Sequence, residues 1–181
     1  MTTASGEFDP KDPIPSFVAN WQRVLLEPRA FFEGLPEGGL EPPLLFALIC
    51  LAIGGFGFML FGGGIKGFLG VLLIGVLRLF AGAVIVSLIA QKLFDGRGDY
   101  EATFRVLSYS TAVAVVIGIP VIKYFAALYG FYIVILGLAR AHSFDTVRAM
   151  LATLASVLVG MVIIHALSLG GWMHRHNPLL R

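Results

Sequence analysis

Residues 67–90 read GFLGVLLIGVLRLFAGAVIVSLIA, an apolar run whose only charge is Arg78. Divided at Arg78, the run would leave two pieces too short to cross a hydrocarbon core of about 30 Å, whereas the whole run is long enough. The stretch therefore predicts one membrane-spanning helix with an arginine in its middle third.

The composition of the 181-residue chain also indicates a bilayer as its solvent. Hydrophobic residues make up 57% of the chain and charged residues 13%, the latter about half the proportion usual in a soluble domain. Mean hydropathy is +0.87, and the apolar residues fall in long blocks. These features exclude a soluble enzyme and a disordered chain, and a lone cysteine, Cys50, excludes a disulfide framework.

Four more apolar stretches flank the opening run. Residues 106–139 would form a helix of about 51 Å, longer than any bilayer is thick, so we divide them at Pro120 and Lys123. The sequence predicts an all-α integral membrane protein whose domain over 44–171 is a bundle of five transmembrane helices. The predicted spans are 44–61, 67–90, 106–122, 124–139 and 149–171.

The segments outside the membrane domain differ in character. Residues 1–15 are polar and aperiodic and predict a disordered tail. Residues 16–35 predict a short amphipathic interfacial helix and a turn, because Phe17, Trp21 and Val24 share one helical face. A helix that docks on protein in water is an equal alternative. Residues 172–181 form a short basic tail.

Positive charges decide the orientation of the five spans. With the N-terminus inside, the cytoplasmic side holds eight of the lysines and arginines and the outer side four. The positive-inside rule therefore predicts an N-terminus in the cytoplasm and a C-terminus outside. This assignment depends on the break at Pro120, since four spans would return the C-terminus to the inside.

Arg78 and His165 are the polar residues deepest in the predicted spans. An arginine at that depth costs a few kcal/mol and usually faces the bundle interior or a watery cavity. One interpretation makes Arg78 an anion or lipid-headgroup site; the other has it snorkelling, or bonded to Ser108 and Tyr109. His165 fits a hydrogen bond between helices. The spans contain no carboxylate, which argues against a proton relay.

Motifs for catalysis and for cofactors are absent from the sequence. There is no nucleophile elbow, no His-Glu-x-x-His zinc motif and no phosphate-binding glycine loop. His174 and His176 have no cysteine or carboxylate neighbours that would make a metal site, and no basic aromatic patch suits nucleic acid. We therefore expect no enzyme activity, no cofactor, no metal and no nucleic-acid partner.

The second half of the chain carries a pattern of turns and span boundaries. The turn DGRGDY (95–100) precedes FRVLSYS (104–110), Ile119-Pro120 stands near the end of the third span, and GLARAH (137–142) closes the fourth. Together with WQRVLLEPRAFF (21–32), this pattern resembles the Yip domain family over roughly residues 17–165. The shared positions look structural, and they include Gly96, Gly98, Tyr109, Pro120 and His142.

The resemblance implies five spans with a cytoplasmic N-terminus. The chain is similar to the short prokaryotic members of the family, which implies a prokaryotic inner membrane as its location. Eukaryotic members act as adaptors or membrane-shaping factors. We therefore expect a non-catalytic membrane scaffold or adaptor, or a membrane-shaping factor, whose partners are the bilayer and membrane-associated proteins or further copies of the chain. The alternative is a small anion transporter or channel that uses Arg78.

Overall fold

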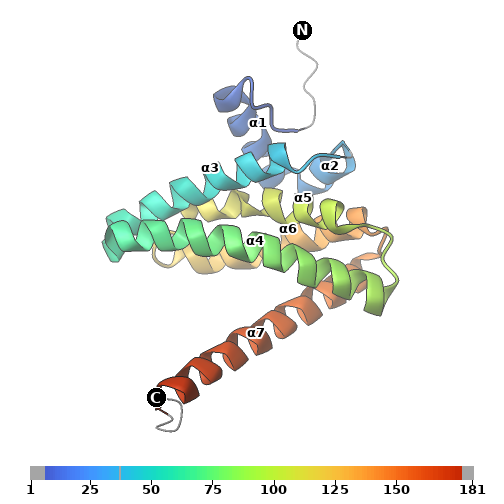
Figure 1. Ribbon diagram of the computed structural model, residues 1–181. Coiled ribbons are helices and arrows are strands. Elements are labelled where there is room, and N and C mark those ends of the chain that lie inside the picture. The colour runs from blue at the N-terminus through green and yellow to red at the C-terminus, as the bar shows by residue number, and fades with distance from the viewer. Residues whose placement is uncertain (1–6, 37, 177–181) are drawn as a thin grey trace.

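The computed structural model describes residues 7–36 and 38–176, and side chains up to residue 166. This part of the chain is all helical and contains no strand. The helices of the bundle lie side by side, and the last helix crosses beneath them at an angle (Figure 1). The elements are α1 (Pro13–Leu26), α2 (Pro28–Glu33), α3 (Glu41–Phe58), η1 (Met59–Gly63), α4 (Gly64–Phe94), α5 (Tyr100–Ser110), η2 (Thr111–Val116), α6 (Ile122–Ala141) and α7 (Thr146–His176).

Helices α3 and α4 form a hairpin around a run of glycines. The chain reverses where Gly62 has a φ of 108° and Gly64 a φ of 55°, angles that a residue with a Cβ rarely adopts. On the way back, Gly75 packs against Leu51 and Gly67 against Phe58, so the two helices are antiparallel. Helix α4 is one continuous helix that includes Arg78.

The long apolar stretch 106–139 is broken on either side of Pro120. Helix α5 passes into the 3₁₀ helix η2, which ends at Val116, and α6 begins at Ile122. Thr111 donates from its hydroxyl to the Ser108 carbonyl at 2.6 Å, a local bond that competes with the helical ladder. Gly54 lets α3 approach closely, since a Cβ there would overlap the Ala114 carbonyl.

Three helical stretches of the described chain are long and apolar enough to cross a membrane, namely Glu41–Phe94, Ile122–Ala141 and Thr146–Ala166. The first contains the hairpin and therefore both α3 and α4. The rod of α5 and η2 is not among the three, so the count of five spans stays a prediction.

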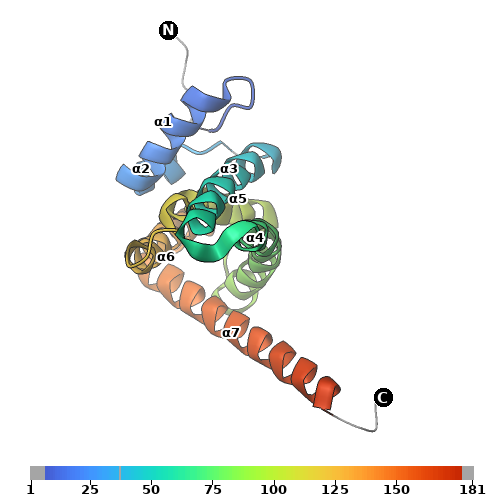
Figure 2. The same cartoon turned by 90° about the vertical axis from the view of Figure 1, so that its left-hand side faces the viewer.

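The N-terminal segment is more ordered than the sequence predicted. Residues 1–6 lie outside the described part, but Phe8 is buried and α1 starts at Pro13, within the stretch that we expected to be a disordered tail. Proline suits the first turn of a helix because it has no N–H to leave unpaired. Helix α1 runs transverse to the bundle, as Figure 2 shows, and Trp21 Nε1 donates to the Ala112 carbonyl at 2.9 Å.

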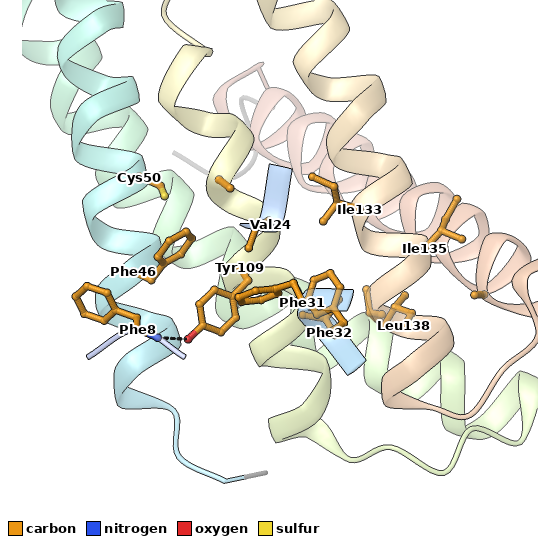
Figure 3. Packing of buried hydrophobic residues seen from close by; sticks show 14 residues of the cluster. Phe8, Val24, Phe31, Phe32, Phe46, Cys50, Tyr109, Ile133, Ile135 and Leu138 are labelled. Atoms are coloured by element: carbon orange, nitrogen blue, oxygen red, sulfur yellow. Dashed lines mark hydrogen bonds between the residues drawn. The ribbon is translucent and has the colours of Figure 1, made fainter. Parts of the chain in front are cut away.

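Aromatic side chains fill the core between α1, α2, α3 and α5. The Tyr109 ring lies 4.9 Å from that of Phe31 and 5.0 Å from that of Phe46, centroid to centroid. Phe8 enters from the N-terminal segment and packs against Phe46 (Figure 3). The core thus joins the segments before α3 to the membrane bundle.

Helix α7 leaves the bundle along most of its length (Figure 1). Ala152 and Ser156 are buried, but beyond Val157 no described side chain of α7 is buried. The helix continues to His176, so the first five residues of the predicted tail 172–181 are helical. Residues 177–181 lie outside the described part.

Candidate functional site

Three connections meet at one end of the bundle (Figure 1): the first comprises residues 34–36 and 38–40, the second 95–99 and the third 142–145. We call these three connections, with α1 and α2, the loop face. The backbone N–H of Arg97 donates to the carbonyl of His142 at 3.3 Å, which ties the second connection to the third. The first connection is held by a side chain, that of Arg105.

Arg105 is buried at the loop face, with 4% of its side chain exposed. Its guanidinium donates to the carbonyls of Pro36, at 2.8 Å, and Gly39, at 2.6 Å, and also to that of Gly38. It forms an ion pair with Glu7 at 2.6 Å. Because a buried guanidinium is stable only when its donors are used, these partners explain why an arginine is tolerated here.

Local sequence sets Arg105 in place. Asp99 caps α5, since its carboxylate accepts from the Ala102 N–H at 2.8 Å. Gly38 and Gly39 have φ angles of 94° and 81°, which turn consecutive carbonyls toward the guanidinium at little conformational cost. The cap of α5 fixes the helix that carries Arg105, and the two glycines direct backbone carbonyls toward its guanidinium.

Glu7 connects Arg105 to Tyr109, one helical turn further along α5. The Tyr109 hydroxyl donates to the Glu7 carboxylate at 3.2 Å and accepts from the Phe8 N–H at 3.4 Å (Figure 3). Burial raises the pKa of Glu7, and Arg105 and Tyr109 offset part of that rise. The N-terminal segment is thus attached to the bundle through buried polar contacts.

His142 organises the opposite side of the loop face. The Thr103 hydroxyl donates to the Asp99 carbonyl at 2.9 Å and lies 2.9 Å from His142 Nε2. Nε2 therefore carries the proton and donates to Thr103, which leaves the buried Nδ1 unprotonated and without a partner among the described residues. Burial lowers the pKa of His142, although the Asp99 carboxylate acts in the opposite direction.

Two glycines allow the loop to close over this histidine. A Cβ at Gly96 would lie 2.5 Å from His142 Nδ1, and one at Gly98 would overlap the carbonyl oxygen of Ala141. Gly96, Gly98 and His142, which belong to the family pattern, thus lie together, and each contributes to the packing of this turn.

A cleft of about 550 Å³ opens between these two polar clusters. Its charged groups come from the connection 95–99, α5 and α6, and apolar groups come from α2, α5 and α6. The other two connections contribute uncharged residues. The lining residues are Phe32, Leu35, Pro36, Gly38, Arg97, Gly98, Asp99, Glu101, Ala102, Arg105, Val106, Gly137, Arg140, Ala141 and Ser143.

The structure does not bring the four predicted intramembrane polar residues into one site. Ser108 and Tyr109 are buried on α5, whereas Arg78 on α4 and His165 on α7 are exposed. Neither Arg78 nor His165 lines the cleft. Pro120 lies in the turn before α6, far along the rod from the loop face.

Sequence reasoning missed Arg105 and Glu7. Arg105 directly precedes the predicted start of the third span at residue 106, so the hydropathy pattern places it in a loop, and Glu7 lies within the predicted disordered tail 1–15. The spacing of Arg105 and Tyr109 at i and i+4, which places both on one face of a helix, was the available signal.

Comparison with known proteins gives a family assignment. No curated protein and no solved structure matches the chain significantly. The model of the Yip1 domain matches residues 23–167, which contain the last turn of α1, all of α2 and all three connections of the loop face. The match confirms the resemblance seen in the turns and span boundaries, and the chain belongs to the Yip1 domain family of membrane proteins.

Proposed function

We propose that this protein is a non-catalytic membrane scaffold of five spans, whose loop face lies in the cytoplasm and binds partner proteins or shapes the lipid surface. Membership of the Yip1 domain family and the apolar helices support a membrane-associated role. The proposed scaffold role is argued from the way the three connections of the loop face are held together.

The observation that carries the proposal is the fixation of three connections into one surface. Arg105 holds the first connection to α5, and His142 holds the second to the third. Buried polar networks of this kind rigidify the surface they support. Around them stand exposed charges that can contact a partner, including those of Arg97, Asp99, Arg140, Asp145 and Arg148.

Helix directions support the proposed topology. Gly54 and Gly57 of α3 meet Ala114 and Gly118 in the same order along the chain, so α3 and the rod of α5 and η2 are parallel. Helices α4 and α6 run back beside them (Figure 1). A rod that crosses the membrane would therefore keep all three connections on one side, the side that carries most of the lysines and arginines.

Helix α1 supports contact with the lipid surface. Its outer edge exposes Ile14 at 75%, Val18 at 44% and Leu26 at 78%, while Trp21 packs inward. A transverse helix with an apolar outer edge fits the headgroup boundary of a bilayer. This is the structural basis for the membrane-shaping form of the proposal.

Anion transport through Arg78 gains no support from the described part of the chain. Arg78 is exposed on α4, and the cleft at the loop face does not reach it. A liposome flux assay that compares the wild type with Arg78→Ala tests this alternative, and equal flux would remove it.

Site-directed photo-crosslinking in native membranes tests the scaffold. A photoreactive residue replaces Asp145 on the loop face, and a matched control replaces Lys123 beside the Pro120 turn, since both side chains are exposed. The proposal predicts discrete protein adducts from position 145 and none from position 123, or tubulation of vesicles by the reconstituted protein. Equal labelling at both positions together with unchanged vesicles would contradict it.

A further inference from the structure

The cleft at the loop face is lined by charged side chains that have no partner within the described chain. Arg105 is neutralised by Glu7, but Arg97 and Arg140 have no ion pair or side-chain hydrogen bond among the described residues. Both side chains are exposed at the cleft and come from different elements, the connection 95–99 and α6. Two free guanidinium groups beside one cavity favour a phosphate ligand.

One residue of the cleft lining, Glu101, has an unsatisfied acceptor. The Oε1 atom of Glu101 is buried and has no hydrogen-bond partner within the described chain. A buried carboxylate oxygen costs free energy until a donor reaches it. Asp99 is exposed and caps α5 through one oxygen, whereas Glu101 holds a buried oxygen that lacks a donor, so Glu101 gains more from a cationic donor.

The charges of the lining are balanced once the pair of Arg105 and Glu7 is set aside. Two arginines, Arg97 and Arg140, stand against two carboxylates, Asp99 and Glu101. A purely anionic ligand would meet the carboxylates unfavourably, and a purely cationic ligand would meet the arginines. A zwitterion with a phosphate and a protonated amine satisfies both.

An apolar wall determines where the remainder of such a ligand would go. Phe32, Leu35 and Val106 line the cleft on the side of α2 and α5. Gly137 leaves this wall room, because a Cβ there would overlap the Val106 side chain and press on Phe32. Since the cleft opens at the end of an apolar bundle, its position fits a lipid whose chains lie along the helices.

We propose that the cleft binds the phosphoethanolamine headgroup of a membrane phospholipid, with the phosphate between Arg97 and Arg140 and the ammonium group donating to Glu101. The cavity of about 550 Å³ lies in the size range of small-molecule sites. The site goes beyond the scaffold proposal and does not depend on it.

Calorimetric titration of the delipidated full chain in a maltoside detergent tests this site. The ligands are dioctanoyl phosphatidylethanolamine, dioctanoyl phosphatidylcholine and free O-phosphoethanolamine. We expect the ethanolamine lipid to bind at least about tenfold more tightly than the choline lipid, because a trimethylated amine has no N–H to donate to Glu101. The free headgroup should bind more weakly than the lipid, since it lacks contact with the apolar wall.

Substitutions in α5 and α6 test which side chain binds the ammonium group and which binds the phosphate. Glu101→Gln should remove most of the preference for ethanolamine over choline, and Arg140→Gln should weaken both lipids about tenfold or more. Arg148→Gln is the matched control, because Arg148 is 64% exposed, pairs with Asp145 and does not line the cleft. Thermal unfolding without ligand checks that each variant is folded, and the two cleft variants lie on different helices, so each reports independently.

Three results would overturn the proposal. Equal affinity for the ethanolamine and choline lipids would remove the role of Glu101. Unchanged binding in folded Glu101→Gln and Arg140→Gln would place the ligand elsewhere. A free headgroup that binds as tightly as the lipid would identify a soluble phosphate ester as the ligand and contradict the assignment to a membrane lipid.

Discussion

Two arginines of this chain stand in opposite environments. Arg105 is buried at the loop face, where one carboxylate and three carbonyls use its donors, whereas Arg78 stands exposed on α4 in the middle of an apolar run. Hydropathy alone draws attention to Arg78. An arginine therefore does not organise the protein merely because it lies deep in an apolar run. It does so where carboxylates and carbonyls surround its guanidinium and accept its hydrogen bonds.

Removal of Arg105 should have the largest effect. Arg105→Met leaves Glu7 and the carbonyls of the first connection without their donor, and loss of one partner of a buried pair costs about 3–5 kcal/mol. Thermal unfolding in detergent measures the loss. Arg78→Met is the control and should change the free energy of unfolding by no more than about 0.5 kcal/mol. Equal losses of unfolding free energy in the two variants would contradict the view that Arg105, and not Arg78, holds the fold together.

A methyl group added at Gly98, in the connection 95–99 that packs over His142, should destabilise the protein. In Gly98→Ala the new Cβ would overlap the Ala141 carbonyl, and overpacking of this kind costs about 1–3 kcal/mol. Gly70→Ala provides the control, because a Cβ there meets nothing within 4 Å and alanine favours the helix. The difference in unfolding temperature between the variants checks this, and a Gly98→Ala protein as stable as the wild type would refute the packing described.

Protonation of His142 at low pH should lower the free energy of unfolding, by less than the two substitutions above. Because burial lowers the pKa of His142, the unfolded chain binds a proton more readily, so stability should fall as the pH drops below about 6.5. Each pH unit between the unfolded and folded pKa values costs about 1.4 kcal/mol. The raised pKa of Glu7 acts in the opposite sense, but it is common to the wild type and to His142→Gln.

The difference between the two pH profiles of unfolding isolates the histidine. His142→Gln should remove the acid-dependent loss of stability. Coincident profiles for the wild type and His142→Gln would show that His142 is not buried in its neutral form.

The helical class and the membrane character could be predicted from the sequence, because both follow from local composition and run length. The glycines at 62–64 and the proline at 120 also act locally, which is why they indicate where the chain turns. Family membership could be inferred from the turns around Gly96 and Gly98 and from His142. These features need no knowledge of distant partners.

The centre of the loop face could not be predicted in the same way. Glu7 and Arg105 are 98 residues apart, and no local pattern joins them. Helix α5 begins six residues before the predicted third span, because Thr103, Arg105 and other buried polar groups on it resemble a loop in a hydropathy profile. The N-terminal segment has no periodicity, yet burial of Phe8 and the ion pair of Glu7 order part of it.

A double-mutant cycle between Glu7 and Arg105 tests whether their ion pair organises the loop face. The free energy of unfolding is measured for the wild type, Glu7→Gln, Arg105→Met and the double variant. We predict a coupling energy of about 1.5–3 kcal/mol, the range for a hydrogen bond to a charged group. Additive effects within about 0.3 kcal/mol would contradict a loop face that is organised by this pair.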